Sequence, residues 1–462
     1  MDNLKLTSGS VIHFAGIGGI GMSGLAKMFA ENGFMVSGSD RDAARPENQR
    51  IIKALENSGI RIFPQDGSFI RSVKPDFMVY SSAVEEGNPD FTAAEIPRIH
   101  RSQALSEAIR QMQNCVSVAV SGSAGKTTVT AWLAETMFLC GMAPSCLNGG
   151  LLNRFASDSN PGNYIHGSGQ YMIFEADESD KSLTAYSPDF ALLMNIGTDH
   201  YSKEELTAVF GRFIANVKLG LVIEASAYER LKRLIPPHLK VTVFDGGDWE
   251  LTGYHQTNGK IMISINHLPE FQIPMSGRHN AVNALAIVAM LDMLGLPFEE
   301  TAAGLTQFQG VWRRFDYAGR MTSGARVYDD YAHNVEKICS CINSAQELTP
   351  GGRVFAIFQP HGFGPLGFMR QELLPALERI LRQEDRFIFL PPFYAGGTSS
   401  FKPTSQEVAA EYSRLGSREY FCYSERDLVR AMLAEEAGGN DLVLIMGARD
   451  NSLSSWAKTL TR

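Results

Sequence analysis

A glycine-rich loop that follows a short apolar segment constrains this chain more than any other feature. Residues 120–128 read Val-Ser-Gly-Ser-Ala-Gly-Lys-Thr-Thr. The apolar lead-in from Cys115 to Val120 predicts a buried strand, and the residues after Thr127 predict a helix. In a strand, loop and helix of this kind, backbone N–H groups and the helix N-terminus point at phosphate oxygens. We therefore expect Lys126 to contact the outer phosphates of a nucleotide and Thr127 to hold magnesium.

One position of this loop departs from the general phosphate-loop pattern, which needs a glycine where the chain has Val120. The shorter pattern Gly-x-x-Gly-Lys-Thr-Thr remains. An ordinary Gly/Ser turn before a helix is the alternative interpretation, and we favour a phosphate site. The residues that would form it are Gly122, Ser123, Ala124, Gly125, Lys126, Thr127 and Thr128.

The chain carries a second glycine-rich turn, Gly16-x-Gly18-x-x-Gly21, close to its N-terminus. Asp40 follows the turn at the place where an acid reaches a ribose hydroxyl in dinucleotide-binding folds. A tight structural turn is the alternative, but the order of the surrounding elements favours nucleotide binding. Those predicted elements are a strand over 11–15, a helix over 20–31 and a strand over 34–37.

Length and composition set the broad class. A chain of 462 residues is too long for one core and predicts about three domains. Its 44% hydrophobic and 20% charged residues are typical of a soluble protein, and the net charge of −8 argues against a nucleic-acid surface. The six cysteines form no Cys-x-x-Cys pair, and no run of about 18 apolar residues occurs. We expect a cytoplasmic protein that binds neither nucleic acid nor membrane.

Strand-like and helix-like segments alternate along the chain, which predicts an α/β fold with mainly parallel sheets. In the middle of the chain, residues 241–273 are typical of β-hairpins and residues 280–293 predict a helix. We expect three domains: an N-terminal Rossmann-like domain over 1–107, a central domain with a P-loop ATPase-type sheet over 108–320, and a C-terminal Rossmann-like α/β domain over 321–462.

Carboxylates gather directly after a predicted strand over 171–174, where the residues from Glu175 to Asp180 include four of them. The next strand leads into the segment from Asn195 to His200. Crowded like charges are costly unless a cation compensates them, although in a solvated loop they are harmless. Beside a phosphate loop we expect that cation to be magnesium, which prefers carboxylate and phosphate oxygens and takes a histidine nitrogen less often.

Two further groups of side chains suit a nucleotide. Asn280 and Asn283 share one face of a predicted helix, at a spacing that could hydrogen-bond an adenine edge. A plain helix cap is the alternative for these amides. Arg314 and Asp330 belong to short motifs with the charges that a triphosphate and a ribose need.

Short motifs of these kinds stand in one order along the chain, at residues 12–24, 38–40, 81–84, 122–128, 148–150, 175–180, 195–200, 277–280, 310–315, 329–333 and 359–361. In this order they resemble the motifs of the Mur ligases, closest to the branch that joins L-alanine to UDP-N-acetylmuramate. The resemblance implies UDP-sugar, ATP and amino-acid binding by the three domains in turn. It implies amide synthesis driven by ATP in peptidoglycan precursor formation. The lactyl carboxylate would attack the γ-phosphate to give an acyl phosphate, and the amine of an amino acid would displace phosphate.

The resemblance also assigns roles to single residues. The implied catalytic residues are Lys126, Glu175 and His200, and the implied metal ligands are Thr127, Glu175 and His200. The implied ATP contacts beyond the loop are Asn280 and Asn283 at adenine, Arg314 at the phosphates and Asp330 at the ribose. The implied UDP-sugar contacts are Gly16, Gly18, Gly19, Gly21, Asp40 and Ser81, and the implied acceptor contacts are His333 and His361. We expect a monomer or a weak homodimer.

The acceptor side departs from the family pattern. A histidine of the family stands where this loop has Ala124, and two arginines of the family stand where this chain has Gly362 and Pro365. A guanidinium fork is the natural partner of a carboxylate. We therefore expect the acceptor to be held differently, by Arg370 or Lys402, and it need not be L-alanine.

Three other functions compete with this one. A murein-peptide ligase would join a preformed peptide to the same UDP-sugar. A nicotinamide oxidoreductase would use the N-terminal glycines but leave the second phosphate loop without a role. A non-catalytic binding protein would explain the missing arginines, but the retained Lys126, Glu175 and His200 argue against it.

Overall fold

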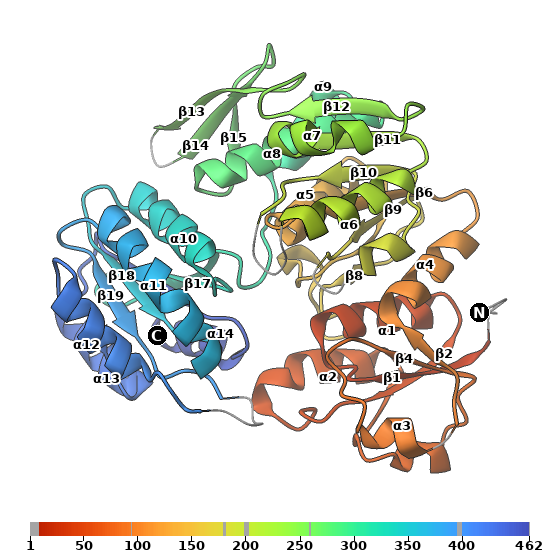
Figure 1. The fold of residues 1–462 in the computed structure, drawn as a ribbon, viewed down its shortest axis with the longest axis horizontal. Coiled ribbons are helices and arrows are strands. Elements are labelled where there is room, and N and C mark those ends of the chain that lie inside the picture. Colours follow the sequence, from red (N-terminus) through yellow and green to blue (C-terminus); the bar gives the residue numbers. More distant parts are fainter. Residues whose placement is uncertain are drawn as a thin grey trace. The chain divides into compact units, whose positions relative to one another are not determined.

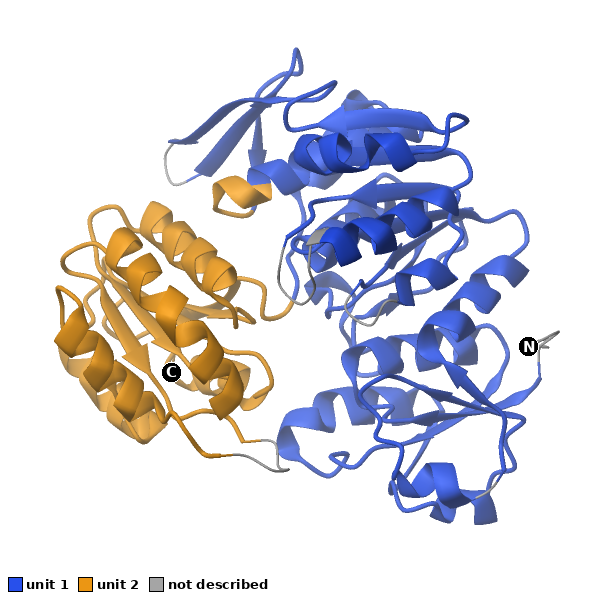
Figure 2. Cartoon of the chain, in the orientation of Figure 1, with its two compact units in different colours: residues 1–274, 281–311 blue, residues 275–280, 312–462 orange. Residues whose placement is uncertain are grey.

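The structure is a computed structural model that describes residues 9–93, 95–178, 182–197, 203–257, 260–394 and 400–461. The chain divides into two compact units, one made of Met1–Pro274 and Ala281–Val311 and the other of Met275–Asn280 and Trp312–Arg462 (Figure 2). Both units combine helices with β-sheets (Figure 1). None of the helices in the described part of the chain has the length and apolarity that crossing a membrane requires.

The first unit begins with a parallel sheet of strand order β3-β2-β1-β4-β5. The predicted strand over 11–15 and helix over 20–31 are confirmed, whereas the strand predicted over 34–37 covers Met35–Ser39. The strands are β1 (Val11–Ala15), β2 (Met35–Ser39), β3 (Arg61–Phe63), β4 (Phe77–Tyr80) and β5 (Arg98–His100). The helices are α1 (Ile20–Glu31), α2 (Gln49–Asn57), α3 (Pro89–Ala93) and α4 (Arg101–Gln111).

The same unit contains a second sheet of order β12-β11-β10-β6-β9-β7-β8, parallel except for the β7–β8 pair. Because β10, β6 and β9 are parallel neighbours, the residues that follow them share one edge of the sheet. The strands are β6 (Val116–Ser121), β7 (Ser145–Leu147), β8 (Tyr164–Ile165), β9 (Tyr171–Glu175), β10 (Phe190–Leu193), β11 (Gly220–Glu224) and β12 (Lys240–Phe244). The helices that follow along the chain are α5 (Lys126–Leu139), α6 (Lys203–Ala215), α7 (Ala225–Leu231), α8 (Arg278–Met293) and α9 (Phe298–Thr306), and residues 278–280 of α8 belong to the second unit.

The hairpin prediction over 241–273 is wrong in its first part. β12 pairs in parallel with β11 across α7, so it belongs to the larger sheet. Only β13 (Leu251–Thr257), β14 (Lys260–Ile265) and β15 (Phe271–Ile273) form the antiparallel sheet. Alternating apolar residues occur in both kinds of strand, and the helix that separates β11 from β12 is what makes the parallel connection possible.

The second unit contains a sheet of order β16-β17-β21-β18-β19-β20, parallel except for the β16–β17 pair. Alternate residues of β18 and β21 enter separate cores: Ala356 and Leu444 pack on one side and Ile357 and Ile445 on the other. Both faces of the sheet are therefore covered by helices, as its apolar strands require. The strands are β16 (Asp316–Arg320), β17 (Arg326–Asp330), β18 (Val354–Phe358), β19 (Arg386–Phe389), β20 (Phe421–Cys422) and β21 (Leu442–Met446). The helices are α10 (Val335–Leu348), α11 (Phe363–Ile380), α12 (Ser405–Leu415), α13 (Arg426–Glu436) and α14 (Ser452–Thr459).

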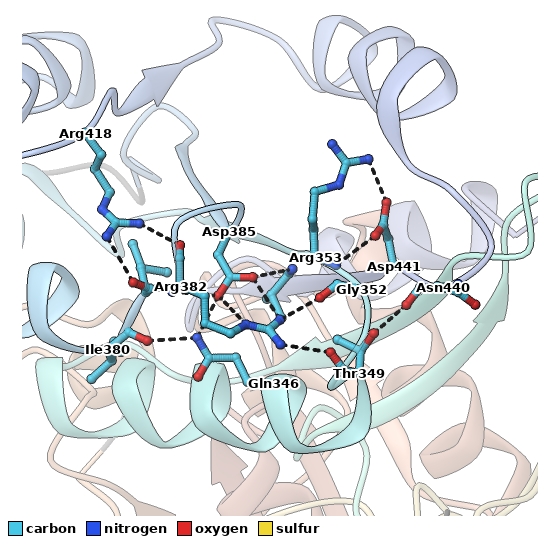
Figure 3. A network of polar contacts seen from close by, with 12 residues as sticks. Gln346, Thr349, Gly352, Arg353, Ile380, Arg382, Asp385, Arg418, Asn440 and Asp441 are labelled. Atoms are coloured by element: carbon cyan, nitrogen blue, oxygen red, sulfur yellow. Dashed lines mark hydrogen bonds and ion pairs between the residues drawn. The ribbon is translucent and has the colours of Figure 1, made fainter.

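A polar network ties together the amino ends of β18, β19 and β21 (Figure 3). The carboxylate of Asp385 accepts hydrogen bonds from the backbone N–H of Val354 at 2.8 Å and from Gln346 at 2.7 Å, and it pairs with Arg382 at 2.9 Å. Asp441 forms a second pair with Arg353 at 2.8 Å. At this amino edge of the sheet, buried carboxylates therefore accept the hydrogen bonds of donors that water would otherwise have to satisfy. The loops that follow the strands lie at the opposite, carboxyl edge.

Candidate active site

The glycine-rich loop is built as the sequence predicts, between the end of β6 at Ser121 and the start of α5 at Lys126. Gly125 has a φ of 86° and caps the helix in the left-handed region, where glycine is favoured. A Cβ atom on Gly125 would also lie 2.9 Å from Oδ1 of Asn283. The close approach places Asn283 against the loop, so one of the two predicted adenine contacts adjoins the predicted phosphate site.

Asn195, which follows β10, holds the middle of the loop. Its Oδ1 accepts from the N–H of Ala124 at 2.9 Å, and its Nδ2 donates to the carbonyl of Ala124 at 3.0 Å. The N–H of Ser123 donates to the carbonyl of Asn195 at 3.1 Å. The loop leads into the N-terminus of α5 at Lys126, and the N-terminus of a helix is an environment that suits a phosphate.

Lys126 is the cation of the loop, and it lies among carboxylates that follow β9. Its Nζ donates to Oε2 of Glu178 at 2.7 Å and to the carbonyl of Gly122 at 2.7 Å, and it lies 3.6 Å from Oδ1 of Asp177. Burial lowers the pKa of Lys126, but the charges of Glu178, Asp177 and Glu175 outweigh burial and raise this pKa above its usual value. Lys126 therefore carries its charge at neutral pH.

Thr127 and Glu175 offer oxygen atoms to a cation at the same place. Oγ1 of Thr127 lies 3.1 Å from Oε1 of Glu175, while Oε2 of Glu175 accepts from the N–H of Gly149 at 2.9 Å. Neighbouring ligands of an octahedral Mg²⁺ lie about 2.9 Å apart when each bond is 2.0–2.1 Å long, so this oxygen pair fits that ion. The described residues contain no cluster of three His, Cys, Asp or Glu that could hold a metal on its own. Phosphate oxygens would have to complete the shell, as is usual for Mg²⁺.

His200, the other predicted metal ligand, lies outside the described residues, as do Asp180 and Asp199. The structure therefore places two of the three predicted ligands, and the role of His200 stays a prediction.

A cavity of about 170 Å³ adjoins this group on the side of the N-terminal glycine turn. Glu175 and Asp177 contribute one wall, and Gly21 with Arg101 contributes another, with Arg101 3.7 Å from Asp177. The remaining lining residues are Leu25, Leu105, Leu147, Asn148, Gly149, Ser182 and Tyr186. Gly21 of the N-terminal turn therefore lines the same cavity as Glu175, the carboxylate that contacts Thr127 of the glycine-rich loop. Arg101 could not be predicted from the sequence, because it stands at the start of α4 outside any recognisable motif.

Asp40, which we predict to reach a ribose hydroxyl, fixes the N-terminal glycine turn. Oδ2 of Asp40 accepts from the N–H of Gly18 at 2.9 Å, and a Cβ atom on Gly18 would lie 2.8 Å from that oxygen. Gly16 and Gly19 complete the turn, since the N–H of Gly16 donates to Ser39 at 2.8 Å and that of Gly19 to Gly16 at 3.3 Å. Burial raises the pKa of Asp40. Ser81 follows β4 and is half-buried.

Family models match the chain in three successive segments. The model of the Mur ligase family catalytic domain matches residues 11–113, that of the Mur ligase middle domain residues 120–291, and that of the Mur ligase glutamate ligase domain residues 313–449. The chain belongs to the Mur ligase family. It is therefore a ligase with the three-part α/β architecture of that family, and the nicotinamide oxidoreductase alternative is wrong.

Relatives within the Mur ligase family match almost from end to end. The UDP-N-acetylmuramate–L-alanine ligase of Anaeromyxobacter sp. (strain Fw109-5) is 33% identical over 457 residues, covering 95% of each chain. The crystal structure of the UDP-N-acetylmuramate–alanine ligase of Thermotoga maritima is 26% identical, with a TM-score of 0.80 over 97% of this chain and 98% of that one. A murein peptide ligase from Psychrobacter arcticus 273-4 shares the fold, with a TM-score of 0.68, 21% identity and 98% of each chain covered.

In the second unit of this Mur ligase, the residues that we predict to contact ATP form hydrogen bonds and ring contacts with nearby residues of the protein. Both carboxylate oxygens of Asp330 accept backbone hydrogen bonds at 2.6 Å, from Phe315 and from Ala332. The guanidinium of Arg314 lies over the ring of Tyr331, 5.3 Å from its centre. Asn280 is buried and donates to the carbonyl of Ser276 at 2.7 Å. Their contacts with ATP stay predictions.

The two predicted acceptor histidines lie together. The rings of His333 and His361 meet edge to face with their centres 5.2 Å apart. Burial lowers the pKa of His333 to about 4 and also lowers that of His361, so both are neutral at neutral pH. Gly362 is the N-cap of α11, a position at which glycine provides no cation. Arg370 and Lys402, the expected replacements, are both paired with carboxylates, at 3.8 Å with Glu411 and at 3.1 Å with Glu407.

Proposed function

We propose that this protein joins an amino acid to the lactyl carboxylate of UDP-N-acetylmuramate, with ATP cleaved to ADP and phosphate. One observation carries the proposal. Lys126 and Thr127 contact Glu178 and Glu175, the carboxylates after β9, and Glu175 lines a cavity that Gly21 of the N-terminal turn also lines. One cavity next to a nucleotide loop and a second glycine turn suits a reaction between two phosphorylated substrates. The names and the extent of the matched relatives support the same function.

The chemistry requires activation of a carboxylate, which is a poor electrophile at neutral pH. Its oxygen would attack the γ-phosphate, and the amine of the acceptor would then displace phosphate from the acyl phosphate. Lys126 would neutralise charge on the phosphoryl group in transfer, since such transfer depends mostly on positioning and electrostatics. Thr127 and Glu175, with His200 by resemblance, would hold Mg²⁺, which supplies further neutralising charge when bound.

The other predicted residues bind the two nucleotides in this proposal. Asp40, Ser81 and the N-terminal glycines would receive the UDP moiety, because Asp40 already fixes the turn through Gly18. Asn283 lies at the phosphate loop and would reach adenine together with Asn280. Arg314 and Asp330 would meet the phosphates and the ribose of ATP.

L-Alanine is the acceptor that we propose first. The relatives named for L-alanine match over nearly the whole chain, and the alanine ligase of known structure has a higher TM-score than the murein peptide ligase. The absence of a cation at Gly362 and Pro365 favours a second candidate, a ligase of this family for another amino acid. We further propose a monomer or weak homodimer in the cytoplasm, where the free thiols of its cysteines are stable.

The test is a reaction of the purified protein with ATP, Mg²⁺ and UDP-N-acetylmuramate against each amino acid in turn. Phosphate release and the mass of the nucleotide-sugar product are measured together. We expect a product heavier by one amino-acid residue, formed fastest with L-alanine. A preformed peptide that reacts faster than every single amino acid would favour the murein-peptide ligase.

A further inference from the structure

Three loops gather at the carboxyl edge of the sheet in the second unit. β21 lies between β17 and β18, and the backbone bonds continue past the strand ends. The N–H of Gln359 donates to the carbonyl of Met446 at 2.8 Å, and that of Gly447 donates to the carbonyl of Asp330 at 3.2 Å. The segment that begins at Gly447 is therefore a neighbour of the segments that carry His333 and His361.

A buried arginine fixes the backbone of that segment. Arg313 is 1% exposed, and its guanidinium donates to the carbonyls of Gly447, of Ala448 at 2.9 Å and of Asp450 at 3.1 Å. Arg313 also pairs with Asp329 at 3.3 Å. The bonded carbonyls stand on both sides of residue 449, so the chain is held while that one side chain is left to project.

The residue so presented is Arg449. It is exposed, and within the described residues its guanidinium makes neither a hydrogen bond nor an ion pair. The residues directly after the parallel strands β17, β18, β19 and β21 read 331–334 Tyr-Ala-His-Asn, 359–362 Gln-Pro-His-Gly, 390–394 Leu-Pro-Pro-Phe-Tyr and 447–451 Gly-Ala-Arg-Asp-Asn, and within these four stretches Arg449 is the one lysine or arginine. Lys402, further along the connection after β19, is paired with Glu407.

The surroundings of Arg449 suit a small zwitterion. Burial lowers the pKa of His361 and the charge of Arg449 lowers it further, and the two residues follow the neighbouring strands β18 and β21. Nδ1 of His361 is buried and has no hydrogen-bond partner among the described residues. A guanidinium can bind a carboxylate through two N–H groups, and a neutral imidazole can accept a hydrogen bond from an amine.

We propose that Arg449 binds the α-carboxylate of the acceptor, which restricts the acceptor to a free amino acid whose carboxylate lies next to the reacting amine. The proposal rests on the function proposed above, and it assigns the acceptor site to a residue other than Arg370 or Lys402. Arg449 acts in recognition of the second substrate and has no part in formation of the acyl phosphate.

The experiment compares the wild type with Arg449→Ala and Arg449→Lys, using the amino acid that the wild type turns over fastest and its carboxamide. We expect kcat/KM for the amino acid to fall roughly 10- to 100-fold in Arg449→Ala, the size of a lost charge-assisted hydrogen bond, with less loss in Arg449→Lys. The kcat/KM for the carboxamide should change by less than about 3-fold, because a carboxamide has no carboxylate charge for Arg449 to bind. Arg414→Ala, at an exposed arginine on α12, is the matched control and should behave as the wild type.

A second measurement isolates the first half-reaction. Hydroxylamine, without an amino acid, traps the acyl phosphate of UDP-N-acetylmuramate as a hydroxamate and releases phosphate. We expect equal hydroxamate yields from wild type and Arg449→Ala. An unchanged preference for the free carboxylate in Arg449→Ala would overturn the proposal, and so would a hydroxamate yield that falls with the substitution, which would assign Arg449 to a phosphate. A wild type that forms no hydroxamate would overturn the proposed function and this inference with it.

Discussion

Lys126 and Glu178 form an ion pair in which Nζ and Oε2 are 2.7 Å apart. The ammonium of the phosphate loop is thus neutralised by a carboxylate that follows the neighbouring strand β9. In the reaction proposed above, a phosphate that enters the loop would be a second anion for the same ammonium. In the free protein, the carboxylate stabilises a charge that would otherwise be buried beside Gly122 without a counter-charge.

Replacement of Lys126 by Ala should reduce phosphate release that depends on UDP-N-acetylmuramate by roughly 1,000-fold, because the charge that stabilises the phosphoryl group is lost. The same change leaves Glu178 buried without its partner, so stability should fall as well. The double variant Lys126→Ala/Glu178→Gln separates the two effects: we expect its thermal midpoint to recover and its activity to stay low. Recovery of turnover in the double variant would show that Lys126 has only a structural role.

Replacement of Glu175 by Gln should weaken the response to Mg²⁺. The amide keeps the shape of the side chain but removes the charge next to Oγ1 of Thr127. We expect the Mg²⁺ concentration for half-maximal activity to rise at least about 10-fold. Titration of ATP turnover with Mg²⁺ measures this, with Glu178→Gln as the comparison at a neighbouring carboxylate. Equal midpoints for wild type and Glu175→Gln would contradict the metal assignment.

Acid should destabilise the first unit through His13. Its ring is fully buried, contacts Ser37 and Ser39 at 3.0 and 3.3 Å, and has its pKa lowered by burial to about 3. An unfolded histidine takes up a proton below about pH 6.5, and the native one does not. The stabilisation is therefore complete above that pH and is lost as pH falls toward 3, by about 2 kcal/mol at pH 5.

His13→Gln should remove this dependence. Pulse proteolysis in urea at pH 7.5 and pH 5 measures the unfolding free energy of the N-terminal sheet, with His238→Gln as a control at an exposed histidine. We expect the wild type to lose about 2 kcal/mol more than His13→Gln between the two pH values. Parallel losses in the two proteins would mean that His13 is protonated in the native state.

Replacement of Asp385 by Ala should destabilise the second unit without an effect on chemistry. The change removes the acceptor for the buried N–H of Val354 and the partner of Arg382, at the sheet edge opposite the acceptor loops. We expect a loss of about 3 kcal/mol in the free energy of unfolding, and less than about 0.5 kcal/mol for the exposed neighbour Glu384→Ala. Urea unfolding of the two variants measures the difference. Similar midpoints for both would show that the network contributes little.

The sequence predicted what local pattern determines. Glycines, apolar runs and the residues that follow strands located the strand and helix around Lys126, the acids after β9 and the amide of Asn283. The sequence did not predict which distant segments contact one another. Neither Arg101 in the cavity nor Asn195 against Ala124 belongs to a pattern that would reveal its partner, since each depends on strand order. Arg449 was missed for the same reason, because β21 reaches its place between β17 and β18 only through the topology of the sheet.

In the proposed reaction, ATP cleavage and amide formation are coupled at the site of Lys126 and Glu175. The direct measurement is the stoichiometry of ADP, phosphate and amide product when the purified protein receives ATP, Mg²⁺, UDP-N-acetylmuramate and L-alanine, with each substrate omitted in turn. We expect equal amounts of the three products when all substrates are present and no amide when any one is missing. ATP hydrolysis that proceeds at the same rate without the UDP-sugar, with no amide formed from any amino acid, would contradict this coupling.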